Sequence, residues 1–304
     1  MAALTRETLT SLLGSAISPA PETVETEVLR RFDHDGVEGE ALMIHCGQRR
    51  VPAARLLPPG NASGTGSAVL YCHAHGNRYD IGKAELLDGR PALQDPPLGL
   101  WLARQGHVVL CADMPGFGER QAEGPETALA KAALWNGRTL FGAMMADTAL
   151  AHRALLAMDR VDSGRIATVG FSMGATLAYW YAALEPSIAA AAHMCAFANI
   201  APLIETGAHD LHGIYMTVPG LLREHDMADV AALVAPRPQF AASGLKDPLT
   251  PPDALYPALD RLRETYAALD AAGKLWIETN CETAHAETPA MRERLGAFLA
   301  EALR

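Results

Sequence analysis

From residue 66 to the end of the chain, short apolar runs alternate with longer stretches of helical character. The helical candidates lie near 97–105, 126–158, 173–184, 252–272 and 289–303, and the apolar runs are 67–76, 107–118, 165–172, 188–197, 237–247 and 274–282. Runs that are apolar on both faces and separated by helices indicate a parallel sheet covered on both sides. The sequence therefore predicts the α/β fold class, with a mostly parallel, doubly wound sheet.

Two parts of the chain depart from this alternation. Residues 23–57 alternate more weakly and predict two or three antiparallel edge strands. The first 27 residues predict an amphipathic helix, because a secretion signal needs a positive start and an unbroken apolar stretch. Residues 199–236 form a long insertion, which we expect to cover the carboxyl edge of the sheet as a small cap. We thus divide the chain into an N-terminal extension, residues 1–65, and a main domain, residues 66–304.

Composition narrows the class of protein. The chain has 304 residues, 49% of them hydrophobic, which is enough for one sizeable core. A formal net charge of −10 argues against nucleic-acid binding, which calls for a basic face. No apolar run approaches the length of a membrane span. The five cysteines are scattered and form no CxxC pair, so we expect a reducing, cytoplasmic setting.

The segment "GFSMG", residues 170–174, places Ser172 where an apolar run ends and a small-residue helix begins. A sharp strand-to-helix turn needs small residues two positions before and after the exposed hydroxyl, and Gly170 and Gly174 meet that need. The hydroxyl then lies near a helix N-terminus, which favours developing negative charge. Ser172 is thus a candidate nucleophile, although a serine that merely caps the helix would also fit the position.

A serine nucleophile requires a base, and the base requires an orienting carboxylate. Asp247 follows the apolar run 237–247, and His285 follows the last apolar run. Ser172, Asp247 and His285 therefore occur in the order nucleophile, acid, base. Asp247 could instead be a turn residue before Pro248, with Asp253 as the rival acid. The other histidines weighed against His285 are placed in the insertion or in an apolar run: His209, His212, His225 and His193.

Two backbone N–H groups would stabilise the negative oxygen of a tetrahedral intermediate. One comes from the residue after the nucleophile, Met173, and the other from the loop after the first parallel strand. In that loop, "HAHGN", His75 is the first choice and Asn77 the alternative. The pair His73 and His75 lacks a third and fourth ligand, so we predict no metal site.

Other residues are candidates for lining the same sheet edge. Asp113, in "ADMPGFGER", follows the second parallel run and is interpreted as a buried carboxylate bonded to backbone amides. The substrate-binding candidates come from the loop after residue 76 and from the insertion, and each of them could instead only pack the cap on the domain: Arg78, Tyr79, Ile214, Tyr215, Met216, Leu221 and Leu222.

Together, "GFSMG", "HAHGN", "ADMPGFGER", "GLKDPLTP" and "TAHAE" resemble the α/β-hydrolase superfamily, and most of all its dienelactone-hydrolase-like and acetyl-xylan-esterase-like serine esterases. The resemblance covers about residues 66–304. It implies the α/β-hydrolase fold, no cofactor, and the roles of nucleophile, acid and base for Ser172, Asp247 and His285. Dienelactone hydrolases carry cysteine as nucleophile, so serine makes dienelactone itself a doubtful substrate. The loop reads H-A-H-G rather than H-G-G, which leaves the second oxyanion donor open.

These observations predict a serine hydrolase that cleaves small-molecule carboxylic esters, with small acyl groups because the insertion is modest. The alternatives are a peptidase or amidase of the prolyl-oligopeptidase type, which shares the triad and its order, and a non-catalytic binding protein with the same fold. Neither nucleic acid nor membrane is expected as a partner. The sequence leaves the leaving group and the oligomeric state open, a homo-oligomer included.

Overall fold

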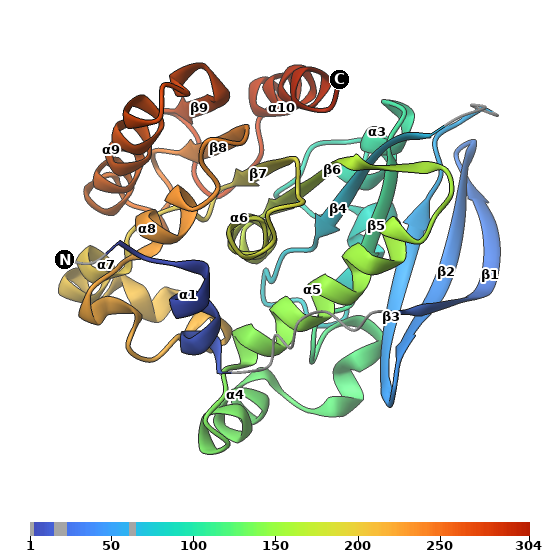
Figure 1. Ribbon diagram of the computed structural model, residues 1–304, viewed down its shortest axis with the longest axis horizontal. Helices are drawn as coiled ribbons and strands as arrows, with labels where there is room; N and C mark the ends of the chain where they lie inside the picture. The colour runs from blue at the N-terminus through green and yellow to red at the C-terminus, as the bar shows by residue number, and fades with distance from the viewer. Residues whose placement is uncertain (1–2, 15–22, 61–64) are drawn as a thin grey trace.

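The computed structural model describes residues 3–14, 23–60 and 65–304. Within them, nine strands form one sheet in the order β1-β2-β3-β5-β4-β6-β7-β8-β9 (Figure 1). The strands from β4 onward pair in parallel, and they are β4 (Gly66–Cys72), β5 (Val108–Ala112), β6 (Val161–Phe171), β7 (Ala190–Met194), β8 (Gln239–Gly244) and β9 (Leu275–Asn280). The predicted mostly parallel α/β sheet is confirmed.

An antiparallel meander forms one edge of the sheet. It consists of β1 (Glu25–His34), β2 (Val37–Cys46) and β3 (Arg49–Leu56). β3 pairs antiparallel with β5, so these strands continue the main sheet rather than form a separate unit. Residue 65, the predicted division, therefore lies between the antiparallel strands and the parallel strands of one sheet. Residues 61–64, in the turn-rich connection to β4, lie outside the described residues, as do residues 15–22 of the N-terminal segment.

Helices cover both faces of the sheet. Strand residues alternate between two buried clusters, as Leu70 and Tyr71 of β4 illustrate. One face is covered by α1 (Arg6–Leu13), α5 (Leu140–Leu156), α6 (Met173–Leu184), α8 (Met227–Ala232) and α9 (Pro252–Ala268), and the other by α2 (Glu85–Asp88), α3 (Leu98–Arg104) and α10 (Pro289–Ala302) (Figure 1). α1 is the expected amphipathic helix, with Leu9 and Leu13 fully buried. In the described ranges, no helix has the length and apolar character needed to cross a membrane.

The single helix predicted over residues 126–158 is wrong. The chain forms α4 (Glu126–Trp135) and then α5, with a break between them. Gly137 in the break has a positive φ of 65°, which glycine adopts at little cost. The Thr139 side chain accepts a hydrogen bond from Gly142 N–H and begins the second helix. An Asn-Gly step followed by a capping threonine explains the interruption.

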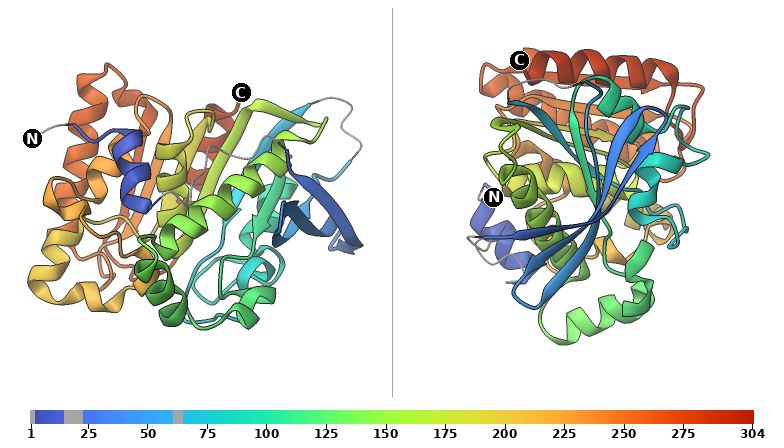
Figure 2. Two further views of the ribbon diagram at one scale, coloured as in Figure 1. Left: turned by 60° about the horizontal axis from the view of Figure 1, so that its bottom comes forward. Right: turned by 90° about the vertical axis from the view of Figure 1, so that its right-hand side faces the viewer.

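The insertion forms a cap of short elements between β7 and β8 (Figure 2). They are α7 (Ile200–Thr206), α8 and the 3₁₀ turns η3 (Ala208–Leu211), η4 (Ile214–Met216) and η5 (Leu221–Arg223). Two hydrogen bonds join η4 and the segment just before it to the main domain. Tyr215 N–H donates to Glu126 Oε1 at 2.8 Å, and His212 Nε2 donates to the Leu249 carbonyl at 2.9 Å. These contacts hold η4 beside the loop that follows β8.

The N-terminus of α6 packs directly on the carboxyl ends of β4 and β6. A Cβ atom on Gly174 would lie 1.8 Å from the Cys72 carbonyl oxygen, and one on Gly170 would lie 2.1 Å from the Gly174 carbonyl oxygen. Because these obstacles are backbone atoms, no rotamer change would relieve the overlap. The two glycines therefore permit the close approach of helix and strands.

We expect Gly174→Ala to lower the free energy of unfolding by about 3 kcal/mol or more, because the added methyl must push α6 away from β4. Gly273→Ala is the matched control, since a Cβ there meets nothing within 4 Å. Urea denaturation of both variants measures the difference. Equal midpoints would contradict the packing constraint.

His193 is the buried core histidine that the sequence predicts. It is 1% exposed on β7, its ring contacts those of Tyr179 and Phe197, and Nε2 lies 3.0 Å from Gln239 Nε2. Burial lowers the pKa of His193 to about 3. Burial likewise lowers the pKa values of His107 and His152 to about 4. All three imidazoles are therefore neutral in the folded protein at pH values where the unfolded chain is protonated.

This gives stability a defined pH dependence. Below the unfolded pKa of 6.5 the unfolded state binds more protons than the folded state. The contribution of these neutral histidines to the free energy of unfolding is therefore complete above pH 6.5 and is lost as the pH falls towards 4. Each histidine contributes a slope of up to about 1.4 kcal/mol per pH unit. We expect His193→Gln to reduce the slope of unfolding free energy against pH between 4 and 6. Chemical denaturation at several pH values checks this, and an unchanged slope would contradict it.

Candidate active site

Ser172 occupies the turn between β6 and α6 in a strained backbone conformation. Its φ of 56° and ψ of −125° are rare for a residue with a side chain. Ser172 N–H donates to the Met194 carbonyl of β7 at 2.9 Å, which anchors the turn. The conformation is the one expected of an exposed nucleophile on a strand-to-helix turn. A serine serving only as a helix cap would not require it, and Ser172 makes no side-chain capping bond.

The structure brings Ser172, His285 and Asp247 into one hydrogen-bonded chain. His285 Nε2 lies 2.9 Å from Ser172 Oγ, and His285 Nδ1 lies 2.7 Å from Asp247 Oδ2. Asp247 Oδ1 accepts the Leu249 N–H at 2.9 Å, and the side chain of Asp247 is fully buried. With Nδ1–H donating to the carboxylate, Nε2 presents its lone pair to the serine hydroxyl.

The rival acid and bases lie elsewhere. Asp253 is exposed in the first turn of α9, and none of the hydrogen bonds of the described residues joins it to His285. His209 and His225 remain in the cap, exposed and half-buried respectively. His212 lies nearer, because it bonds the Leu249 carbonyl two residues beyond Asp247, and burial lowers its pKa.

The two backbone N–H groups predicted to hold an oxyanion, those of Met173 and His75, make no hydrogen bond among the described residues. Met173 is the first residue of α6, where N–H groups have no partner within the helix. The N–H of His75 has no protein acceptor in the part of the chain that the structure describes. Asn77, the alternative donor, is occupied because its N–H donates to His75 Nδ1 at 3.0 Å. Asn77 N–H is thus engaged within the loop, and the assignment of the second donor to His75 stays a prediction.

The His75 side chain connects the loop to the cap. Its Nδ1 accepts from Asn77, so the ring donates from Nε2 to Glu126 Oε2 at 2.5 Å. Tyr79 donates to the same oxygen at 2.9 Å, and the Tyr215 ring stacks on His75 at 5.8 Å. Burial alone would raise the pKa of Glu126, but the hydrogen bonds from His75, Tyr215 and Tyr79 lower it overall. Glu126 thus lies as a carboxylate between loop and cap.

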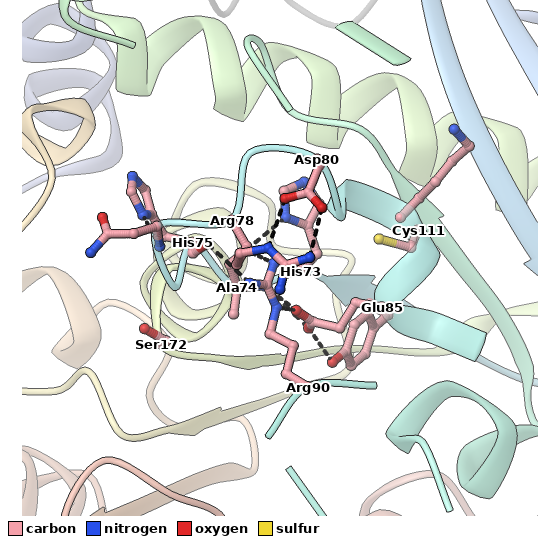
Figure 3. Close-up of polar contacts among 12 residues, drawn as sticks. His73, Ala74, His75, Arg78, Asp80, Glu85, Arg90, Cys111 and Ser172 are labelled. Atoms are coloured by element: carbon pink, nitrogen blue, oxygen red, sulfur yellow. Dashed lines mark hydrogen bonds and ion pairs between the residues drawn. The ribbon is translucent and has the colours of Figure 1, made fainter. Parts of the chain in front are cut away.

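A buried ion pair contacts the backbone of the same loop (Figure 3). Glu85, at the start of α2, is fully buried and pairs with Arg90. Glu85 also accepts the Tyr71 hydroxyl at 2.6 Å and Ala74 N–H at 3.1 Å. Arg90 donates to the carbonyls of Ala74 at 2.6 Å and His75 at 3.0 Å. Three of these bonds, from Ala74 N–H to Glu85 and from Arg90 to the two carbonyls, therefore fix residues 74–75.

A second buried pair anchors the loop of His285. Arg292 donates to both carboxylate oxygens of Glu287, at 2.8 and 2.6 Å. Gln94 N–H donates to Glu287 Oε2 at 2.9 Å, and Glu287 N–H donates to the Ala92 carbonyl at 2.8 Å. The segment that follows Arg90 is thus also bonded to the loop of His285.

The predicted substrate-binding residues lie in three different surroundings. The guanidinium of Arg78 pairs with Asp80 at 2.7 Å on the surface, so its exposed head is engaged there rather than with the triad. Tyr79 and the buried Tyr215 instead donate hydrogen bonds to Glu126, the carboxylate that also accepts from His75. Met216 lines a cavity of about 380 Å³ in the cap, whose wall is largely apolar and includes Ile200, Ile204, Ile214, Leu221 and Met227 as well as His212.

Asp113 has the structural environment that the sequence suggests. Its carboxylate accepts the N–H groups of Lys83 at 2.7 Å and Glu119 at 3.0 Å, and pairs with Lys83 Nζ at 2.7 Å. Among the described residues, no cluster of three or more His, Cys, Asp or Glu side chains is arranged to hold a metal ion.

Sequence reasoning missed several residues that position these loops. Glu85, Arg90 and Arg292 lie in segments without a motif, and only the tertiary structure brings them to the loop backbones. Glu126 stands at the start of a predicted helix, where an acidic residue is ordinary. Glu287 follows His285 by two residues, and that proximity is the one sequence signal that could have identified it.

Comparison with known proteins agrees with the fold. A family model described as alpha/beta hydrolase fold matches residues 91–215. YtaP of Bacillus subtilis (strain 168), a protein named as a hydrolase, is 32% identical over 299 residues, which cover 98% of this chain and 99% of YtaP.

Two solved structures share the fold at low sequence identity. A glucuronoyl esterase from Solibacter usitatus has a TM-score of 0.68 and 14% identity, over 98% of this chain and 92% of that one. An acetyl xylan esterase from Paenibacillus sp. R4 has a TM-score of 0.66 and 17% identity, over 98% and 93%. Because the match to YtaP extends over almost the whole of both chains, and the model of the alpha/beta hydrolase fold matches residues 91–215, the chain belongs to the α/β-hydrolase family.

Proposed function

We propose that the protein hydrolyses carboxylic esters through Ser172. The observation that carries this proposal is the hydrogen-bonded chain Ser172–His285–Asp247, with contacts of 2.9 and 2.7 Å on a strained turn. His285 takes the serine proton as Oγ attacks the ester carbonyl, and Asp247 stabilises the imidazolium that forms. His285 then returns the proton to the departing alcohol.

The second half of the cycle uses the same groups. Water, deprotonated by His285, attacks the acyl-enzyme carbonyl, and collapse of the second tetrahedral intermediate releases the carboxylic acid and restores Ser172. In both halves the negative oxygen would be held by the N–H groups of Met173 and His75. Donors of this kind are each worth about 3 kcal/mol of transition-state stabilisation. No cofactor enters any step.

The acyl group is proposed to be small, and acetyl is its simplest form. Two observations support this: the cap is short, and a structural neighbour is named an acetyl xylan esterase. Tyr215, 4% exposed, further narrows the space beside His75. The apolar cavity of the cap, which Met216 lines, is a candidate site for the alcohol group.

Cleavage of an amide by the same residues is the second candidate, as in peptidases of the prolyl-oligopeptidase type. It receives less support, since the structural neighbours named above are esterases and the chain has no propeller-like domain in its described residues. A binding protein without catalysis would not need the complete triad geometry. Reaction with a fluorophosphonate separates that third reading from both enzymes.

We expect the wild type to release p-nitrophenol from p-nitrophenyl acetate, and Ser172→Ala to lose roughly 10⁵-fold or more of kcat, because no other group replaces the nucleophile. The octanoate ester should be hydrolysed more slowly than the acetate. Spectrophotometric rates measure both effects. Equal rates for wild type and variant would contradict nucleophilic catalysis by Ser172, and a preference for octanoate would contradict the small acyl group.

Asp247→Asn should lower kcat by about 10⁴-fold while the protein stays folded, since an amide at this position favours the wrong tautomer of His285. Asp253→Asn is the matched control and should retain wild-type kcat, because Asp253 is exposed on α9. Steady-state kinetics on p-nitrophenyl acetate compare the two. A large loss in the control, or none in Asp247→Asn, would assign the acid elsewhere.

A further inference from the structure

We propose that the buried pair Glu85–Arg90 positions the oxyanion hole by orienting and polarising the N–H of His75. This inference rests on the proposed function and assigns a role to two residues that contact neither Ser172 nor His285. Glu85 is fully buried, and the Arg90 side chain is 5% exposed. The pair is therefore shielded from water, where its hydrogen bonds to the loop are strongest.

The orientation follows from the planarity of one peptide unit. The Ala74 carbonyl and the His75 N–H belong to the same trans peptide and point in opposite directions. Arg90 Nη2 holds the Ala74 oxygen at 2.6 Å, and His73 Nδ1 donates to it at 3.0 Å. The His75 N–H must therefore point away from Arg90. In Figure 3, Ser172 is drawn on one side of this loop and Glu85 on the other.

The flanking peptide units are held by the same pair. Ala74 N–H donates to both oxygens of Glu85 at 3.1 Å, and Arg90 Nη1 donates to the His75 carbonyl at 3.0 Å. Three consecutive peptide units are thus fixed. The loop then continues through Gly76 and Asn77, which have positive φ values of 54° and 53°. Gly76 has wide conformational freedom, so the contacts from Glu85 and Arg90 restrict the loop before it.

Arg90 also strengthens the donor. A guanidinium bonded to a carbonyl oxygen withdraws electron density from the whole amide, so the N–H at its other end becomes a better donor. The charge of Arg90 is thereby transmitted to His75 N–H through a single peptide group. Glu85 balances that charge, which allows an arginine to be buried here at a tolerable cost.

The pattern of contacts separates this pair from an ordinary buried ion pair. Glu40 of β2 is also buried and pairs with the half-buried Arg55 of β3, and Glu40 additionally accepts from Arg31 at 3.1 Å. Those contacts are between side chains. Glu85 and Arg90 instead direct most of their bonds to the backbone of the loop that contains the proposed donor. Arg55→Lys is therefore a matched control for Arg90→Lys.

The test compares Arg90→Lys, Glu85→Gln and Arg55→Lys by steady-state kinetics on p-nitrophenyl acetate and by inhibition with a trifluoromethyl ketone. That ketone adds to the serine and places an oxyanion in the hole. We expect Arg90→Lys to lower kcat roughly 10- to 100-fold, somewhat less than deletion of a donor, with KM changed by less than about threefold. The inhibition constant of the ketone should rise by the same factor, and Glu85→Gln should act in the same direction. Arg55→Lys should leave both values within about twofold of wild type.

Thermal unfolding and the rate of labelling by a fluorophosphonate complete the experiment. The proposal is overturned if folded Arg90→Lys retains kcat and ketone affinity, or if Arg55→Lys loses as much of both. Should Arg90→Lys fail to fold, Glu85→Gln decides between these outcomes, and Tyr71→Phe, which removes only one bond to Glu85, serves as the milder variant. A wild type that reacts with neither ester nor fluorophosphonate overturns the proposed function itself and this inference with it. Wild-type labelling with an unaffected Arg90→Lys overturns the inference alone.

Discussion

The close packing of α6 against the ends of β4 and β6 is the constraint on which the site depends. Gly170, Gly174 and the Cys72 carbonyl approach so closely that a methyl group would overlap backbone atoms. This approach forces Ser172 into its strained conformation and leaves Met173 N–H at a free helix N-terminus. The loop that follows Cys72 must then pass beside both groups. The proposed nucleophile and the proposed oxyanion donors therefore lie around a single packing contact.

Three buried glutamates hold the loops around that contact in place. Glu85, Glu126 and Glu287 are between 0 and 4% exposed, and each accepts a backbone N–H from a loop or from the cap. Each also has a basic or imidazole partner: Arg90, His75 and Arg292 respectively. Leaving such a carboxylate unpartnered would cost several kcal/mol, so the loops cannot shift singly without breaking a charged contact. A chain whose catalytic groups lie in loops gains rigidity in this way.

The sequence predicts what depends on local pattern and chain order. Alternating apolar runs give the parallel strands within a few residues, and the spacing of Gly170 and Gly174 around Ser172 gives the turn. The order of Asp247 and His285 after it identifies the partners that the structure brings within 3 Å. The sequence could not reveal Glu85 and Arg90, because their role depends on contacts with backbone atoms that only the folded chain brings together.

The H-A-H-G loop shows how a departure from a motif can resolve what the motif leaves open. A glycine in place of His75 would leave Asn77 N–H free to compete as a donor. The imidazole removes that competitor by accepting from Asn77 at Nδ1, and its Nε2–H reaches Glu126 at 2.5 Å. Glu126 in turn holds Tyr215 of the cap. A displacement of the cap would therefore shift His75, the proposed oxyanion donor, because both are bonded to Glu126.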